Sequence, residues 1–352
     1  MTDRNKKRSS FQPWLLAVWL VACPAAFAQK PFQLANILTE AGRSHSFIAK
    51  QHELKVPVTV IHGAQPGPVL LLTAGVHGDE FPSVLALQRL RGEVDAKQLR
   101  GTLILVHLAN LPGFHGRRVA LSPLDEKNLN RVFPGSREGT PTEQLAEFLT
   151  REFIGRSDFL IDMHSGSWNQ KLWPHVYSPF VGNKELDDLT FELAKATGMQ
   201  HIVMYGERPR DPANSISYPN TAMTRGKPAL TTEIGHLGQR DQAAVEQTLD
   251  VARNAIYFLE MLPGKPKRHP DPVIYETLKS VASPADGLFT PRVDIGGTVE
   301  AGTIVGDVRD YFGNVLAELT SPVSGTVFMI SDTPPVKAGE TPVTIGVQAP
   351  GK

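Results

Sequence analysis

Apolar and polar residues alternate along this chain in blocks that predict strands followed by helices. Short apolar runs, of the kind buried on both faces of a sheet, predict strands at 56–61, 69–74, 102–109, 158–163 and 229–234. Helical spacing of apolar residues predicts helices at 81–90, 142–154, 184–197 and 241–262. Because buried parallel strands require helices on both faces, we predict an α/β fold with a mixed, mostly parallel sheet flanked by helices.

The pattern changes after the last predicted helix. Residues 263–272 (PGKPKRHPDP) are rich in proline and basic residues and predict a linker, and residues 273–352 contain short β segments separated by Gly and Pro. Two motifs recur in this second region: Ser-Pro-x-x-Gly begins at Ser283 and at Ser321, and Val-x-Ala-Gly begins at Val299 and at Val336. Such an internal duplication resembles the barrel-sandwich of biotinyl and lipoyl domains. The sequence lacks the modified-lysine tip of those carriers, so we expect a C-terminal all-β module without carrier function.

The composition excludes several classes of protein. Of the 352 residues 41% are apolar, enough for one large α/β core and a smaller module, and 36 basic residues balance 36 acidic ones. A formal net charge of zero gives no electrostatic reason to expect nucleic acid or an anionic membrane surface as a partner. Selectivity must therefore come from local charges.

Residues 1–28 predict a signal peptide, so the predicted catalytic domain spans residues 29–262. Basic residues precede an apolar run at 14–22 that is too short to span a membrane comfortably, and Ala26-Phe27-Ala28 is a small-x-small cleavage site. We predict export to the periplasm, with no stable membrane span in the mature protein. Two alternatives remain: the run ending at Cys23 resembles a lipobox in which Cys23 is lipidated, or the segment stays uncleaved as an anchor. Cys23 is the only cysteine, so a metal in the mature protein must be held by His and carboxylate side chains.

Two histidines and a glutamate predict a metal site at the ends of strands. His77 and Glu80 lie three residues apart just after an apolar run ending in Gly75, where both can face one ion at a strand-to-helix turn. Taken alone, this pair is weak evidence for a metal site. His164 strengthens it, because His164 also follows an apolar strand, and open α/β sheets have their sites at the carboxyl ends of strands. Three protein ligands leave one coordination position for water, which is the arrangement of a catalytic zinc ion (Zn2+), here one per chain.

Four short motifs around these residues occur in a fixed order. They are Gly75-Val76-His77-Gly78-Asp79-Glu80, Asn128-Leu129-Asn130-Arg131-Val132-Phe133-Pro134-Gly135, Asp162-Met163-His164 and Thr232-Glu233-Ile234-Gly235. Through them residues 56–262 are similar to the aspartoacylase and succinylglutamate desuccinylase family of zinc-carboxypeptidase-like hydrolases, many members of which carry a similar C-terminal β module. The resemblance implies a zinc-carboxypeptidase-like fold and zinc ligands at His77, Glu80 and His164, the triplet already proposed from spacing.

The resemblance also implies roles for residues near the metal. Glu233 lies at the end of an otherwise apolar strand, where a carboxylate costs free energy unless it is used, and it is implied to be the general base. Asn130 and Arg131 are implied to bind the carboxylate of the substrate, for which a planar guanidinium is suited. In similar proteins an arginine upstream of this motif polarises the scissile carbonyl, and here that residue is Arg118 or its neighbour Arg117.

The sequence leaves the roles of three groups of residues near the metal site undecided. Asp79 and Asp162 adjoin metal ligands, and they either orient the imidazoles or only carry charge at a helix start or a strand end. Asn128 stands where related sequences usually have an aspartate, which removes a negative charge beside Arg131. Several aromatic residues could line the pocket or simply pack in the core: Trp168, Trp173, Tyr177, Tyr205 and Tyr218.

These features predict a zinc-dependent hydrolase that cleaves the amide bond of an N-acyl amino acid or a similar small carboxylate-bearing substrate, with metal-activated water and Glu233 as the general base. The first alternative is an exported zinc carboxypeptidase that acts on short peptides or cell-wall fragments, in which the carboxylate lies on the other side of the amide. The second alternative is a non-catalytic binding protein that retains the metal site. The sequence indicates neither the acyl group nor the oligomeric state.

Overall fold

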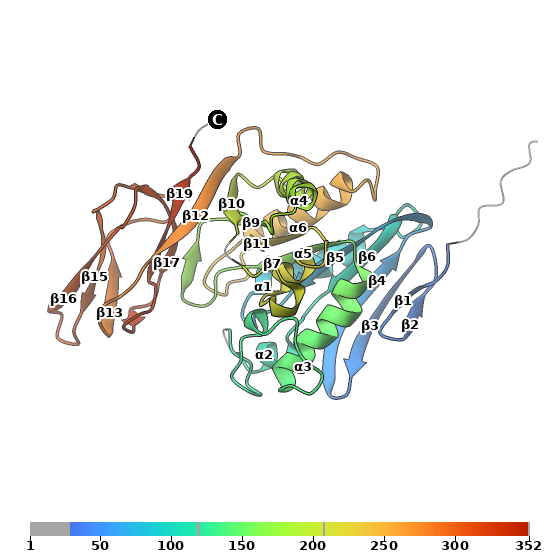
Figure 1. Ribbon diagram of the computed structural model, residues 1–352, viewed down its shortest axis with the longest axis horizontal. Helices are drawn as coiled ribbons and strands as arrows, with labels where there is room; N and C mark the ends of the chain where they lie inside the picture. Colours follow the sequence, from blue (N-terminus) through green and yellow to red (C-terminus); the bar gives the residue numbers. More distant parts are fainter. Residues whose placement is uncertain (1–28, 118–119, 207, 351–352) are drawn as a thin grey trace, which may run out of the picture.

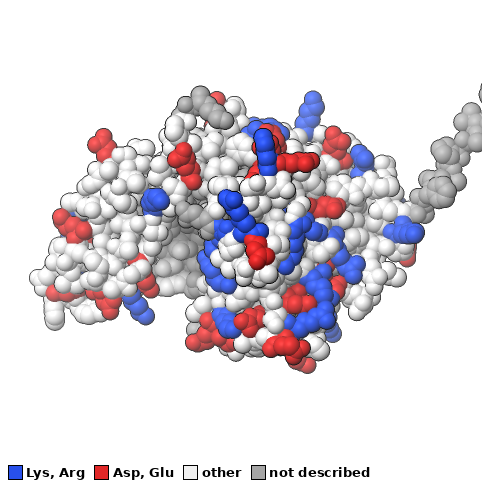
Figure 2. All heavy atoms as spheres, viewed as in Figure 1, with Lys and Arg blue, Asp and Glu red and all other residues white. Residues whose placement is uncertain are grey.

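The computed structural model describes residues 29–117, 120–206 and 208–350. The predicted signal peptide, with its lipobox and anchor alternatives, and Arg118 lie outside the described residues. Within them, a large mixed sheet crosses the molecule with helices on both faces, and a smaller sheet lies at one end (Figure 1). This architecture confirms the predicted α/β class. Basic and acidic side chains are interspersed over the visible face (Figure 2), as the balanced composition leads one to expect.

The large sheet has a mainly parallel centre. Three strands at this centre lie side by side and run parallel: β5 (Gln65–Ala74), β7 (Phe159–His164) and β11 (Ala229–Glu233). Beyond β5 the order is β6 (Arg100–Val106), β4 (Leu54–His62) and β3 (Arg43–Gln51), and a separate hairpin consists of β1 (Phe32–Leu34) and β2 (Ile37–Thr39). Because parallel strands end at the same edge of a sheet, the carboxyl ends of β5, β7 and β11 meet.

On the other side of β11 the sheet continues through two strands that the sequence pattern did not predict into strands of the predicted C-terminal β region. The order is β9 (His175–Pro179), β10 (His201–Tyr205), β12 (Val273–Val281), β19 (Val343–Gln348), β17 (Gly325–Ser331) and β14 (Thr298–Val299), with β8 (Gln170–Leu172) beside β17. β9 and β10 are five residues long, and β9 mixes polar with apolar side chains. Neither strand therefore gives an apolar run as long as the one that marks β5.

Helices on the two faces enclose two hydrophobic cores. One face is covered by α1 (Phe81–Glu93), α4 (Lys184–Ala196) and α6 (Gln242–Phe258), and the other by α3 (Pro141–Phe148) and α5 (Tyr218–Met223). Leu70 and Leu72 of β5 lie in the first core and Leu71 lies in the second, so β5 is buried on both faces as predicted. No helix in the described ranges is long and apolar enough to cross a membrane.

The predicted helix at 241–262 ends early. It begins as expected after Asp241, whose side chain accepts hydrogen bonds from the first backbone N–H groups of α6. The regular helix ends at Phe258, and Glu260 adopts a φ of +53°, which an α-helix cannot contain. Leu259 still packs against the first core from the turn that follows. Apolar spacing therefore continues beyond the last helical residue.

The C-terminal region repeats one β unit, as predicted. The smaller sheet has the order β16 (Val315–Thr320), β15 (Ile304–Arg309), β13 (Gly287–Pro291) and β18 (Pro335–Val336). Gly287 pairs with Val336, and in the same way Gly325 pairs with Val299. The serine of each Ser-Pro-x-x-Gly motif donates its hydroxyl to the carbonyl two residues further on. These equivalent contacts confirm the internal duplication.

The C-terminal region is joined to the rest of the chain through the large sheet. The predicted boundary falls at Val273, the first residue of β12, and β12 pairs in parallel with β10. β19 and β17 extend the same sheet from β12. β17 also pairs with β8, which follows His164 in the sequence. The C-terminal strands therefore contact the segment beside the predicted metal site.

Candidate metal centre and substrate cavity

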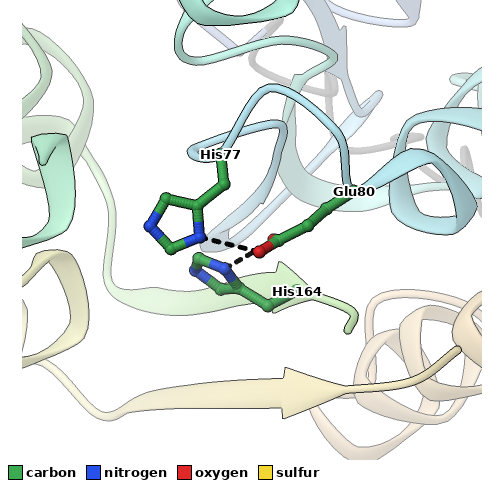
Figure 3. A group of neighbouring side chains, drawn as sticks. All are labelled: His77, Glu80 and His164. Carbon is green, nitrogen blue, oxygen red and sulfur yellow. Dashed lines mark hydrogen bonds and ion pairs between the residues drawn. The ribbon is translucent and has the colours of Figure 1, made fainter. Parts of the chain in front are cut away.

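Two strand ends and one helix start bring the predicted ligands together (Figure 3). After β5, Gly75 turns the chain with a φ of +68°, and a Cβ there would lie 2.6 Å from the side chain of Leu108. His77 follows in this turn, and Glu80 is the residue immediately before α1. His164 is the last residue of β7. Strand ends that are neighbours in the sheet therefore place the three side chains at one point.

The carboxylate of Glu80 contacts both imidazoles (Figure 3). Its Oε1 is 2.7 Å from Nδ1 of His77, and its Oε2 is 2.7 Å from Nδ1 of His164. The two rings stand edge to face with their centroids 4.9 Å apart. One ligand atom from each of the three residues lies within 4.8 Å of the others, so the cluster could hold one metal ion.

The charges in this cluster suit a cation. Burial on its own would raise the pKa of Glu80, but the neighbouring His164 and His77 hold that pKa at about 2. Burial disfavours a charge on His164, yet Asp162 and Glu80 raise the pKa of His164 well above its usual range. Oε2 of Glu80 is buried, and its contact with His164 lacks hydrogen-bond geometry. An ionised carboxylate and two ring nitrogens that face it fit a divalent ion such as zinc.

Two neighbouring side chains orient the imidazoles. Nε2 of His164 lies 2.8 Å from Oδ2 of Asp162, and Nε2 of His77 lies 3.2 Å from Oδ1 of Asn128. When each Nε2 donates its proton to these oxygens, each Nδ1 carries no proton and faces Glu80, as metal ligation requires. The structure therefore places Asp162 where the orienting role considered for it requires it to be.

Asp79 was considered as a partner of an imidazole, but its side chain contacts other groups. Its carboxylate accepts hydrogen bonds from the backbone N–H of Trp168 at 3.0 Å and from the hydroxyl of Ser167 at 3.4 Å. Both residues belong to the segment that follows His164. The idea that Asp79 orients an imidazole is wrong: Asp79 joins the loop of the first two ligands to the segment after the third.

The predicted general base lies beside the cluster. Glu233 ends β11 and pairs in register with His164 of β7. Burial raises the pKa of Glu233, the charge of His164 opposes this, and the charges of Glu80 and Asp162 add to it, so that the pKa reaches about 8. A carboxyl group with this pKa can exchange a proton near neutral pH.

One cavity of about 220 Å³ connects the metal cluster with the predicted substrate-binding residues. Oδ1 of Asn130 accepts a hydrogen bond from the backbone N–H of Tyr218 at 2.8 Å, and Arg131 donates to the carbonyl of Asn130 at 2.7 Å. The predicted residues that line the cavity are His77, His164, Glu233, Asn130 and Arg131. The structure therefore brings together side chains that are far apart in the sequence.

Arg208 is a cavity residue that the sequence did not predict. It lies in the polar loop between β10 and α5, and its Cζ lies 5.1 Å from the centroid of the Tyr205 ring. Tyr205 and Tyr177 are the aromatic candidates that line the cavity, whereas Trp168 and Trp173 do not line it. No spacing or periodicity distinguishes Arg208 from the other basic residues of its loop, so only the fold reveals it.

Arg117 and Arg118 were the two candidates for polarising the scissile carbonyl, and the structure describes one of them, Arg117. Arg117 is exposed, has a φ of +51°, and lines a separate hollow with Phe81 and Trp168. The structure therefore does not bring Arg117 to the cavity. Arg118 lies outside the described residues.

The chain is similar in sequence to a known catalytic domain and to a known deacetylase. Residues 66–259 match the family described as the succinylglutamate desuccinylase/aspartoacylase catalytic domain. The N-alpha-acetyl-L-2,4-diaminobutyric acid deacetylase of Halomonas elongata is 32% identical over 261 residues, which cover 72% of this chain and 74% of that protein.

Solved structures share the fold over nearly the whole described chain. A succinylglutamate desuccinylase from Silicibacter sp. TM1040 has a TM-score of 0.79 at 26% identity, covering 91% of this chain and 99% of that one. The product-bound ectoine utilization protein EutE (DoeB) from Ruegeria pomeroyi has the same TM-score, identity and coverage. These similarities extend beyond the four motifs to the C-terminal β strands.

Proposed function

This chain belongs to the succinylglutamate desuccinylase/aspartoacylase family of amide hydrolases, and on that premise we propose that it is a zinc-dependent deacylase of small N-acyl amino acids. One observation carries the proposal: His77, His164, Glu233 and Arg131 line a single cavity, and Glu80 contacts both histidines. Amide hydrolysis needs an electrophilic centre, an acid-base group and an anchor for the substrate. These three functions can be assigned to neighbouring side chains.

His77 and His164 would hold the zinc ion through their Nδ1 atoms, and Glu80 through its carboxylate. A bound zinc ion supplies an activated water and polarises the carbonyl of the substrate. Asp162 and Asn128 would keep the protons of the imidazoles on Nε2, away from the ion.

Glu233 would perform the acid-base work. It takes a proton from the attacking water and later delivers a proton to the leaving amine. The half-buried position of Glu233 beside Glu80 and Asp162 supports this role, because desolvation and these charges raise its pKa to about 8, so that both protonation states are accessible near neutral pH.

Asn130 and Arg131 would hold the carboxylate of the substrate. Arg131 lines the cavity, and its planar guanidinium can contact both oxygens of one carboxylate. We assign the polarisation of the scissile carbonyl to Arg118, because Arg117 lines a different hollow.

We propose in addition that residues 1–28 direct export. The basic start, the apolar run at 14–22 and the site at Ala26-Phe27-Ala28 support this assignment. Sequencing the N-terminus of the mature protein tests it. A start at Gln29 is expected, a lipidated Cys23 would support the lipobox alternative, and an intact leader would contradict cleavage.

A substrate panel tests the deacylase activity. Zinc-loaded protein is incubated with N-acyl amino acids and with short peptides, and the released amine is measured. We expect turnover of N-acyl amino acids that Glu233→Gln abolishes. Turnover of peptides alone would favour the carboxypeptidase alternative, and zinc binding without any turnover would favour the binding protein.

A further inference from the structure

Three buried polar atoms near the metal cluster lack a partner. They are Oδ1 of Asp162, Oγ1 of Thr73 and the hydroxyl oxygen of Tyr218, and none of them completes a hydrogen bond among the residues that the structure describes. All three side chains are fully buried. A buried polar group without a partner costs free energy, and a carboxylate costs the most. The cost would disappear if the three groups were bonded to one another.

The sheet places these side chains on one face. Thr73 of β5 pairs in register with Asp162 of β7, and neighbouring strands lie about 4.8 Å apart. Leu71 and Leu160 stand two residues before them, on the same face of each strand, and both belong to the second hydrophobic core. Tyr218 of α5 belongs to this core as well. Thr73 therefore lies beside Asp162, under the helix that carries Tyr218.

The side chain of Tyr218 has a fixed position and a bound proton. Its ring stacks on that of Phe133 with the centroids 4.9 Å apart, and its backbone N–H donates to Oδ1 of Asn130 at 2.8 Å. Burial raises the pKa of Tyr218, the nearby hydroxyl of Thr73 opposes this rise, and the charge of Asp162 adds to it. The hydroxyl therefore keeps its proton and can donate it to a neighbour.

We propose that Tyr218 and Thr73 form a hydroxyl chain that fixes the carboxylate of Asp162. In this chain the hydroxyl of Tyr218 donates to Oγ1 of Thr73, and the hydroxyl of Thr73 donates to Oδ1 of Asp162. One hydroxyl group can accept one hydrogen bond and donate another, so Thr73 can serve both neighbours at once. A small rotation of these side chains completes both bonds and satisfies all three buried atoms.

The hydroxyl chain acts on the metal site through His164. Oδ2 of Asp162 lies 2.8 Å from Nε2 of His164, whose Nδ1 faces Glu80. When Thr73 holds Oδ1, the carboxylate cannot turn away from the ring, and Nδ1 stays without a proton and directed at the ion. Tyr218 and Thr73 are therefore positioning residues. This inference rests on the metal site of the proposed function and is independent of the substrate.

Two substitutions of Thr73 separate positioning from packing. Thr73→Val keeps the shape of the side chain and removes the hydroxyl, so the affinity for zinc should fall by about tenfold. Thr73→Ser keeps the hydroxyl and removes a methyl group, so the affinity should stay within about twofold while the free energy of unfolding falls. Competition with a chromophoric chelator measures the affinity, and chemical denaturation measures the stability.

Thr232→Val is the matched control for Thr73→Val. Thr232 is equally buried, and its hydroxyl also lacks a partner among the described residues. Leu230, two residues before it, lies in the first core, so Thr232 lies on the opposite face of the sheet from Asp162. The affinity for zinc should not change in this variant.

Tyr218→Phe tests whether the two hydroxyls act in series. It removes one oxygen and keeps the stacked ring, so the affinity for zinc should fall by about threefold. In the Thr73→Val background the same substitution should have no further effect, because Tyr218 acts through Thr73. Equal losses in the two backgrounds would contradict the chain.

Two further results would overturn the inference: an unchanged affinity in Thr73→Val, or the same loss in Thr73→Val and Thr73→Ser. If the protein binds no zinc, the metal site of the proposed function fails, but the hydroxyl chain can still be tested. Imidazole NMR of the metal-free protein follows the proton on Nε2 of His164, which is assigned by its loss in His164→Gln. Faster exchange of this proton with solvent in Thr73→Val than in Thr73→Ser would support the chain, and equal exchange would refute it.

Discussion

Oδ1 of Asn128 lies 3.2 Å from Nε2 of His77, so a neutral amide orients this imidazole. The same oxygen accepts the backbone N–H of Asn130 at 2.8 Å. Asn128 therefore joins a candidate metal ligand to a candidate substrate-binding residue. Because an amide carries no negative charge, it makes Nδ1 of His77 less basic than a carboxylate would.

Two different substitutions of Asn128 should change the affinity for zinc in opposite directions. Asn128→Asp adds a negative charge beside Nε2 and should tighten zinc binding, whereas Asn128→Leu removes the acceptor and should weaken it by about tenfold. Competition with a chromophoric chelator at constant pH measures both. Asn314→Leu, in the hairpin between β15 and β16, is the control. Equal affinities in all four proteins would show that Asn128 does not act on the ligand.

Substitution of Glu233 should separate catalysis from metal binding. Glu233→Gln retains the shape of the side chain but cannot take a proton, so kcat should fall by about a thousandfold. Zinc content should stay unchanged, because Glu233 does not belong to the ligand cluster. Glu246→Gln, at a partly exposed position on α6, is the matched control. Loss of zinc together with activity would contradict the assigned role.

The metal cluster could be predicted from the sequence because local patterns mark each of its residues. His77 and His164 both follow apolar runs, and strands that bury both faces end at a common edge of the sheet. The position of Glu233 follows from the same rule, since an acidic residue at the end of an apolar strand is unusual. These patterns were sufficient to propose the ligand triplet, whereas the role of Glu233 came from the resemblance to a known family.

Arg208 and the extent of the sheet could not be predicted in this way. Arg208 lies in a polar loop, and its place in the cavity depends on how β10 and α5 are packed, which no local pattern encodes. Val273 stands at a change of composition that predicts a domain boundary, yet β12 begins there and pairs with β10. Strand pairing between distant segments depends on the whole fold and not on either segment alone.

Phe328 of the C-terminal region should contribute both to stability and to substrate binding. It is fully buried, and its ring centroid lies 4.5 Å from that of Tyr275 and 5.1 Å from that of His175. His175 in turn packs on Tyr177, which lines the cavity. Phe328→Ala should lower the free energy of unfolding by about 3–5 kcal/mol and raise KM, because the support of Tyr177 is loosened.

Chemical denaturation and steady-state kinetics measure the two effects of Phe328→Ala. Phe312→Ala is the matched control, because Phe312 belongs to the same region but is 90% exposed. It should change neither stability nor KM. A variant at Phe328 that is as stable as the control would show that the C-terminal strands do not support the cavity.

Protonation of His175 should destabilise the protein in acid. Its ring is buried, and Nδ1 donates to the carbonyl of Trp173 at 2.6 Å. Burial lowers the pKa of His175 to about 4, although this hydrogen bond opposes the shift. The ordinary pKa of the residue in the unfolded chain is 6.5. Between these two values the unfolded chain binds a proton that the folded chain excludes, so stability is lost as the pH falls from about 6.5 to about 4.

Asn at position 175 can retain the hydrogen bond to Trp173 but cannot titrate. At pH 7.5 the His175→Asn variant should be less stable than the unchanged protein, because the packing of the ring is lost. Between pH 7.5 and pH 4, however, its free energy of unfolding should fall by roughly 3 kcal/mol less than that of the unchanged protein. Unfolding is followed by chemical denaturation with a chelator present, so that release of zinc in acid does not contribute. Some pH dependence should remain, because burial also lowers the pKa of His107 to about 4. The control is His45→Asn, at an exposed position, which should leave the pH dependence of the free energy of unfolding unchanged. If His175→Asn also left it unchanged, His175 would not resist protonation in the folded chain.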